Sequence, residues 1–152
     1  MLNSILLGIL LTLVTIGIHA LGTATWIRHL QARAVRDDFE SRSGLGFQLK
    51  LLGSSAIVLL LLHILELTVW AVVYYWWVAT DQFRLFEDAV YFSTVTFASL
   101  GYGDIVIEGS WRLLSAIQAM AGLFVFGWST ALLFAVVQRI WLADEMRARS
   151  RD

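Results

Sequence analysis

Three long stretches that are free of charged side chains, apart from one acid, constrain this chain more than any other feature of its sequence. They cover residues 2–26, 51–80 and 113–138, and the one acid inside them is Glu66. A helix needs about 20 apolar residues to cross a hydrocarbon core about 30 Å thick, so each stretch is long enough to span a membrane. The sequence therefore predicts three transmembrane helices.

The composition excludes several other classes of protein. Of the 152 residues, 59% are apolar and 15% are charged, whereas roughly 25% are charged in soluble domains. A soluble domain of this size has too little interior to hide so much apolar surface. The absence of cysteine excludes disulfides and thiolate chemistry. A net charge of −1 leaves no basic face for nucleic acid, so the expected surrounding partner is membrane lipid.

The basic residues predict how the chain is oriented in the membrane. Residues 27–50 contain five Lys or Arg and residues 139–152 contain four, whereas residues 80–112 contain two. By the positive-inside rule, the connector and the C-terminus are cytoplasmic and the N-terminus is outside, in a plasma (inner) membrane. The first stretch lacks the basic residues that open a signal peptide, so we expect a retained helix.

The connector at residues 27–50 leaves two interpretations open. Its apolar residues recur at near-helical spacing, with charged residues between them. This pattern fits an amphipathic helix lying on the inner leaflet, and a solvated connector fits it equally well. Residues 142–152 are expected to form a short cytoplasmic tail.

A fourth apolar run, residues 89–103, is too short to span the membrane and predicts a re-entrant segment. Glu87 and Asp88 precede it and favour the start of a helix; a helix of about 12 residues would be about 18 Å long and reach only partway across. Ser-Leu-Gly-Tyr-Gly-Asp follows at residues 99–104. The alternating glycines allow successive carbonyls to turn one way, and a ring of such carbonyls can replace the water around a cation.

This arrangement of helices around Gly-Tyr-Gly-Asp resembles the pore module of potassium channels, whose commonest filter sequence is Thr-Val-Gly-Tyr-Gly. The resemblance covers about residues 55–141. It implies an all-α membrane protein with three transmembrane helices, a re-entrant pore helix and a selectivity filter, assembled as a homotetramer because one loop cannot close a ring. The implied division of the chain is an N-terminal transmembrane helix (1–26), the connector (27–50), a pore module (51–141, with outer helix 51–79, pore helix 86–98, filter 99–104 and inner helix 111–141) and the tail (142–152).

The same resemblance implies the residues of an ion site. K⁺, the permeant ion, would be held by the backbone of the filter, and no other cofactor is expected. Asp104 would support the filter with Tyr91 or water as its partner, because Val95 stands where some members carry a glutamate. Glycines of the inner helix would act either as a gating hinge or as close-packing sites. The filter residues are Ser99, Leu100, Gly101, Tyr102 and Gly103, with K⁺ at Ser99, Leu100, Gly101 and Tyr102, and the inner-helix glycines are Gly122 and Gly127.

Glu66 lies near the middle of the second span, where an ionised carboxylate costs at least about 2.5 kcal/mol. It must therefore be protonated or bonded inside the protein. His63 shares its helical face, and pore-helix hydroxyls at Ser93, Thr94 or Thr96 lie at a suitable depth. A tether between outer helix and pore helix and a pH sensor both remain open. His19, in the first span, is expected to be a hydrogen-bonded packing residue.

Other functions fit the sequence less well. His63 and Glu66 supply two ligands for an intramembrane metal, but no third is apparent, and no catalytic motif occurs, so the chain is not expected to be an enzyme. The first span lacks Arg at three-residue spacing and is not a voltage sensor. A non-conducting membrane scaffold and a weakly selective cation channel remain alternatives, the latter because Ser99 and Leu100 depart from the commonest filter.

Overall fold

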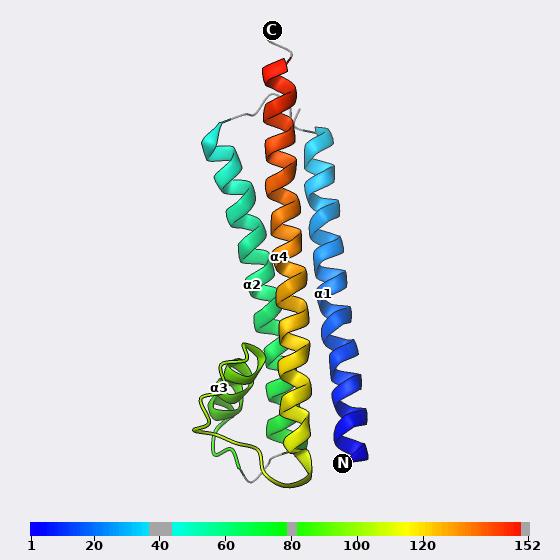
Figure 1. Ribbon diagram of the computed structural model, residues 1–152, viewed down its shortest axis with the longest axis vertical. Coiled ribbons are helices and arrows are strands. Elements are labelled where there is room, and N and C mark those ends of the chain that lie inside the picture. Colours follow the sequence, from blue (N-terminus) through cyan, green and yellow to red (C-terminus); the bar gives the residue numbers. More distant parts are fainter. Residues whose placement is uncertain (37–43, 79–81, 150–152) are drawn as a thin grey trace.

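The computed structural model describes residues 1–36, 44–78 and 82–149, which form long helices and one short one. Figure 1 shows three long helices side by side, with the short helix α3 against one end of α2. The N-terminus lies at the same end as α3, and the C-terminus lies at the opposite end. In order along the chain, the elements are α1 (Leu2–Arg36), α2 (Leu45–Val73), the π-helical turn η1 (Tyr74–Val78), α3 (Phe86–Phe97), the 3₁₀ turn η2 (Gly109–Trp111) and α4 (Arg112–Arg149).

Three helical segments among the described residues are long and apolar enough to cross a membrane. They are Leu2–Ala32, Leu45–Val78 and Gly109–Leu142. No strand occurs in the part of the chain that the structure describes. The predicted fold class, an all-α membrane protein with three spanning helices and a short fourth one, is confirmed.

Several helix boundaries differ from those expected. The first helix was expected to end at residue 26, but α1 continues to Arg36, because no Gly or Pro interrupts residues 23–36. The amphipathic part of the connector is therefore, as far as residue 36, an extension of α1 and not a separate helix on the membrane surface. Residues 37–43 lie outside the described residues.

The other two long helices also extend past the expected limits. α2 begins at Leu45, directly after the extended Gly44, and not at residue 51. α4 continues to Arg149, so most of the expected tail at 142–152 is helical. The expected ends were placed at the first charged residues, whereas polar residues of good helix propensity carry a helix beyond the lipid.

α1 packs on the other helices through a polar face. Its buried side chains include Ser4, Thr15, His19 and Thr23. The indole of Trp70 in α2 donates a hydrogen bond to the Thr15 hydroxyl over 2.9 Å, and the indole of Trp26 donates to Ser55 of α2 over 3.0 Å. Such bonds hold helices together in lipid, where apolar side chains gain little by leaving the hydrocarbon. α1 is therefore fastened to α2 at more than one level.

Candidate functional site

The helix α3 is too short to cross a membrane. Its 12 residues give a length of about 18 Å at 1.5 Å per residue. The carboxylate of Asp88 accepts a hydrogen bond from the backbone N–H of Leu85 over 3.0 Å and so caps the N-terminus. The C-terminal end at Ala98, with the negative end of the helix dipole, leads directly into residues 99–104.

One buried serine fastens α3 to both neighbouring helices. The Ser93 hydroxyl donates to the carbonyl oxygen of Leu67 in α2 over 2.7 Å, and it accepts a hydrogen bond from the Gln118 side-chain amide of α4, also over 2.7 Å. Both Ser93 and Gln118 are fully buried. The depth of α3 is thus set by side-chain bonds to α2 and to α4.

The two glycines of α4 occupy very different surroundings. A Cβ atom at Gly122 would collide with the backbone carbonyl oxygen of Phe97, the last residue of α3, and would lie 2.8 Å from its carbonyl carbon. A Cβ at Gly127 would meet nothing within 4 Å. Gly122 is therefore a close-packing site between α4 and α3, and α4 runs through both positions as one helix.

The backbone after α3 alternates between left-handed and ordinary angles. Ser99, Gly101 and Gly103 have φ values of 57°, 58° and 78°, with negative φ at the two residues between them. This alternation is what allows successive carbonyls to face one side, since an ordinary strand turns them to opposite sides. The segment is anchored at its start because the backbone N–H groups of Ser99 and Leu100 donate to α3 carbonyls over 2.9 Å each.

Sequence reasoning anticipated the two glycines but missed the third left-handed residue. Ser99 is the one non-glycine residue with positive φ in the described parts of the chain. A left-handed angle costs a residue with a Cβ roughly 1–2 kcal/mol, so the surrounding structure must hold it there. The available signal was the period of two, which extends back from Gly103 and Gly101 to residue 99.

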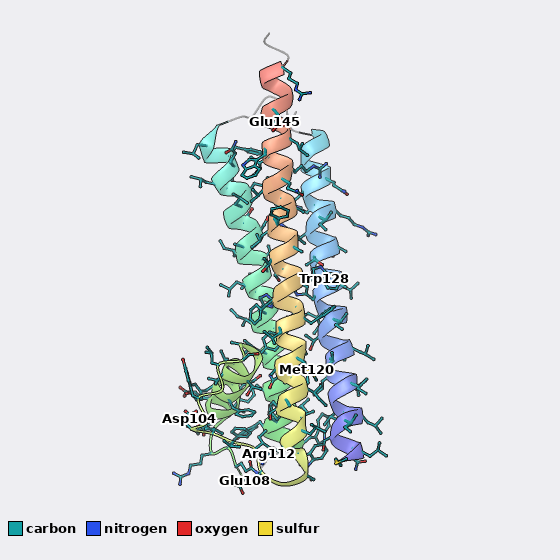
Figure 2. The ribbon with its side chains drawn as sticks, in the orientation of Figure 1. Asp104, Glu108, Arg112, Met120, Trp128 and Glu145 are labelled. Atoms are coloured by element: carbon teal, nitrogen blue, oxygen red, sulfur yellow. The ribbon has the colours of Figure 1, made fainter. Side chains whose placement is uncertain are left out.

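Asp104 and Tyr91, which were expected to pair, are in contact. The Tyr91 hydroxyl donates to the Asp104 carboxylate over 2.7 Å. This bond lowers the pKa of Asp104 below its usual value and raises the pKa of Tyr91, because it favours the carboxylate and the neutral phenol. Figure 2 shows that Asp104, Glu108 and Arg112 all lie at the end of the molecule where α3 lies.

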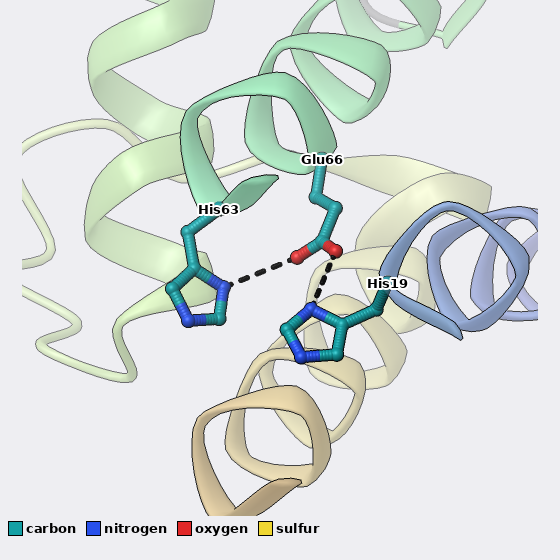
Figure 3. Close-up of side chains that lie close together, drawn as sticks. All are labelled: His19, His63 and Glu66. Atoms are coloured by element: carbon teal, nitrogen blue, oxygen red, sulfur yellow. Dashed lines mark hydrogen bonds and ion pairs between the residues drawn. The ribbon is translucent and has the colours of Figure 1, made fainter. Parts of the chain in front are cut away.

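Glu66 is bonded inside the protein, but to partners other than those expected on α3. Its carboxylate is bound by Nδ1 of His63 over 3.1 Å and by Nδ1 of His19, in α1, over 2.9 Å (Figure 3). The pore-helix hydroxyls that the sequence offered as partners do not bind Glu66: Ser93 donates to the Leu67 carbonyl of α2, and Thr94 donates to a carbonyl within α3. Glu66 thus tethers α2 to α1, because α1 packs at this depth.

Comparison with known families covers the part of the chain that carries this arrangement. A family model described as "Ion channel" matches residues 62–139, just over half of the 152 residues. The match runs from the second half of α2 through α3 and the glycine-rich segment into α4, and it leaves out α1. Searches of curated proteins and of solved structures found no match. The chain is therefore an integral membrane protein that belongs to the ion channel family, with the two-helix, potassium-channel-like pore module of that family.

Proposed function

We propose that this protein is a K⁺-selective channel in which the carbonyls of residues 99–102, with the Ser99 hydroxyl, replace the water around the ion. The observation that carries the proposal is the left-handed backbone at every second residue, directly after a helix that ends partway through the membrane. Carbonyl rings are the established means of dehydrating K⁺. The family supports transport and not catalysis as the activity.

Electrostatics at the filter also support cation conduction. The C-terminal end of α3 carries a partial charge of about −0.5, and it leads into the proposed ion path. The described residues from position 82 to the start of α4 include four acids and two arginines. This excess raises the local concentration of cations at the outer end of the pore. The acids are Glu87, Asp88, Asp104 and Glu108, and the arginines are Arg84 and Arg112.

We further propose that four identical chains surround one pore. A single chain contributes one filter strand, which cannot enclose an ion, and identical chains close most simply around a rotation axis. Tyr102 and Leu100 in the filter are 66% and 55% exposed in the single chain, so surface is available for neighbouring chains. In the proposed orientation α3 and the N-terminus face outward and the C-terminus is cytoplasmic, as the distribution of basic residues predicts.

The test is ion flux through the purified protein in liposomes, with K⁺ and Na⁺ compared. We expect K⁺ flux several times faster than Na⁺ flux, and loss of both in the Gly101→Ala/Gly103→Ala double variant. Each alanine would have to adopt a left-handed angle at a cost of roughly 1–2 kcal/mol. Gly17→Ala is the matched control, because a Cβ there meets nothing within 4 Å and its flux should equal that of the wild type.

Two other results would point to the alternatives. Equal K⁺ and Na⁺ flux would refute selectivity and leave a weakly selective cation channel, consistent with Ser99 and Leu100 in place of the commonest Thr and Val. Absence of flux over a range of pH and voltage, from protein that elutes at the mass of four chains, would favour the non-conducting scaffold. Elution as a single chain would refute the tetramer.

A further inference from the structure

A buried group of polar side chains lies apart from the filter, near the middle of the membrane. It consists of His19 from α1, His63 and Glu66 from α2, and Ser129 from α4. Each residue lies within about five positions, or about 7 Å along the helix, of the centre of its apolar span. All four are buried, and the His19 and Glu66 side chains are fully so. We call these four residues the midplane cluster.

The midplane cluster is a closed ring of four contacts. On one side, the Glu66 carboxylate accepts from Nδ1 of His19 and Nδ1 of His63, over 2.9 and 3.1 Å. On the other side, the Ser129 hydroxyl contacts Nε2 of both imidazoles, over 3.3 and 3.0 Å. The two rings stack with their centroids 5.4 Å apart (Figure 3). Both Nδ1 atoms therefore point to one carboxylate and both Nε2 atoms to one hydroxyl.

Two neutral imidazoles and an ionised Glu66 carboxylate cannot satisfy this ring. If both donate Nδ1–H to Glu66, both Nε2 atoms are acceptors, and Ser129 has one hydroxyl hydrogen to offer them. One buried Nε2 would then remain without a partner, which proteins avoid, so the ring needs one more positive charge: either a proton, on Glu66 or on an imidazole, or a bound cation. If a cation binds both Nδ1 atoms instead, both Nε2 atoms carry hydrogens, and the Ser129 oxygen has two lone pairs to accept them.

We propose that His19 Nδ1, His63 Nδ1 and the Glu66 carboxylate form a binding site for a divalent transition-metal ion such as Zn²⁺. Two imidazoles and one carboxylate are an established zinc ligand set, and bonds of about 2.0–2.2 Å place tetrahedral neighbours about 3.3–3.5 Å apart. The donor separations of 2.9 and 3.1 Å are close to this, and all three donors lie within 4.8 Å of one another. The third ligand, which the sequence did not reveal, comes from α1.

The position of the site suggests what a bound ion would do. His63 and Glu66 lie within the family match at residues 62–139, whereas His19 belongs to α1, which lies outside it. A bound ion would therefore clamp the additional helix to the pore module. Ser129 would act as a positioning residue, since it would hold both imidazoles in the tautomer that presents Nδ1 to the ion. About 10% of the His63 side chain is accessible in the single chain, whereas the His19 and Glu66 side chains are not accessible.

The experiment measures metal binding directly and does not depend on ion conduction. The full chain, purified in lipid nanodiscs and stripped with a chelator, is titrated with Zn²⁺ by calorimetry, and Co²⁺ is used to report the ligand geometry by visible absorption. We expect one Zn²⁺ per chain. His19→Ala and Glu66→Gln should abolish this binding, and Ser129→Ala should weaken it about 10- to 100-fold, the usual effect of losing an outer-shell partner.

His29→Ala is the matched control. It removes the remaining histidine of the chain, which is exposed on α1 and stacks on Trp26, and it should leave Zn²⁺ binding unchanged. Circular dichroism checks that each variant is folded. If Glu66→Gln does not fold, Ser129→Ala still tests the site, because it keeps all three ligands and should only weaken Zn²⁺ binding.

Two results would overturn the proposal. Folded wild-type protein that binds no Zn²⁺ would mean that the ring is completed by an extra proton, on Glu66 or on one imidazole, and is a purely hydrogen-bonded tether. Zn²⁺ binding that is as tight in both His19→Ala and Ser129→Ala as in the wild type would place the metal elsewhere. Neither result bears on ion flux, so a failure of the channel proposal would remain distinguishable.

Discussion

Adding one methyl group at Gly122 should separate the inner helix from the pore helix. In the wild type, α4 approaches α3 so closely that a Cβ at this position would collide with the Phe97 carbonyl oxygen and lie 2.8 Å from the carbonyl carbon. The obstructing atoms belong to backbone, which cannot turn aside as a side chain does. In Gly122→Ala, therefore, α4 must move away from the C-terminal end of α3, next to residues 99–104.

The expected loss of stability can be worked from this contact. Overpacking a well-packed interior costs typically 1–3 kcal/mol, and collision with backbone favours the upper part of that range. Replacing Gly by Ala inside a helix returns up to about 1 kcal/mol. The net destabilisation should be about 2 kcal/mol, or roughly 30-fold in the folding equilibrium. Gly127→Ala, whose Cβ meets nothing within 4 Å, should instead stabilise by up to about 1 kcal/mol.

The assay compares both variants with the wild type during unfolding by sodium dodecyl sulfate in mixed micelles, followed by tryptophan fluorescence. The two substitutions are chemically identical and lie on the same helix, so the gain in helix propensity is the same for both. The difference of about 3 kcal/mol between their free energies of unfolding therefore reports the contact with Phe97. Equal stability of the two variants, or a lower stability for Gly127→Ala, would refute this account of the packing. If Gly127 is a gating hinge, Gly127→Ala should also slow ion flux while the protein stays fully folded.

Two further predictions concern the outer end of the pore and the hydrogen bonds that hold α3 against its neighbouring helices. Tyr91→Phe removes the hydrogen bond that lowers the pKa of Asp104. The bond is present above the usual carboxyl pKa of 3.8 and is lost as the pH falls through the lowered pKa, so inhibition of K⁺ flux by external acid should begin at a higher pH in the variant. An unchanged flux–pH curve would contradict the role of this bond. Ser93→Ala removes a hydrogen-bond partner from the buried Gln118 amide and from the Leu67 carbonyl. It should destabilise the folded protein by about 1–3 kcal/mol in the same detergent titration. Thr94→Ala loses a bond within α3 at an exposed position and should have a markedly smaller effect.

Local patterns in the sequence were sufficient for the spans and for the unusual backbone after the short helix. The lengths of the apolar stretches predicted three transmembrane helices, because a hydrocarbon core sets a minimum length for any helix that crosses it. The acids at the start of α3 and the glycines at 101 and 103 predicted a short helix followed by unusual backbone. Helix ends were predicted poorly, since charge marks where lipid ends and not where helical hydrogen bonding stops.

Contacts between helices were decided by the tertiary structure alone. The apolar residues of α2 surround the helix on all sides, because lipid and protein interior are both apolar, so periodicity does not reveal which face meets α1. The rotation of each helix therefore had to come from packing. That rotation brings residues 19, 63, 66 and 129 into one ring and places Gly122 on the Phe97 carbonyl. The sequence by itself determined what spans the membrane and where the left-handed backbone lies, and the packing of nearly featureless helices decided which polar side chains meet.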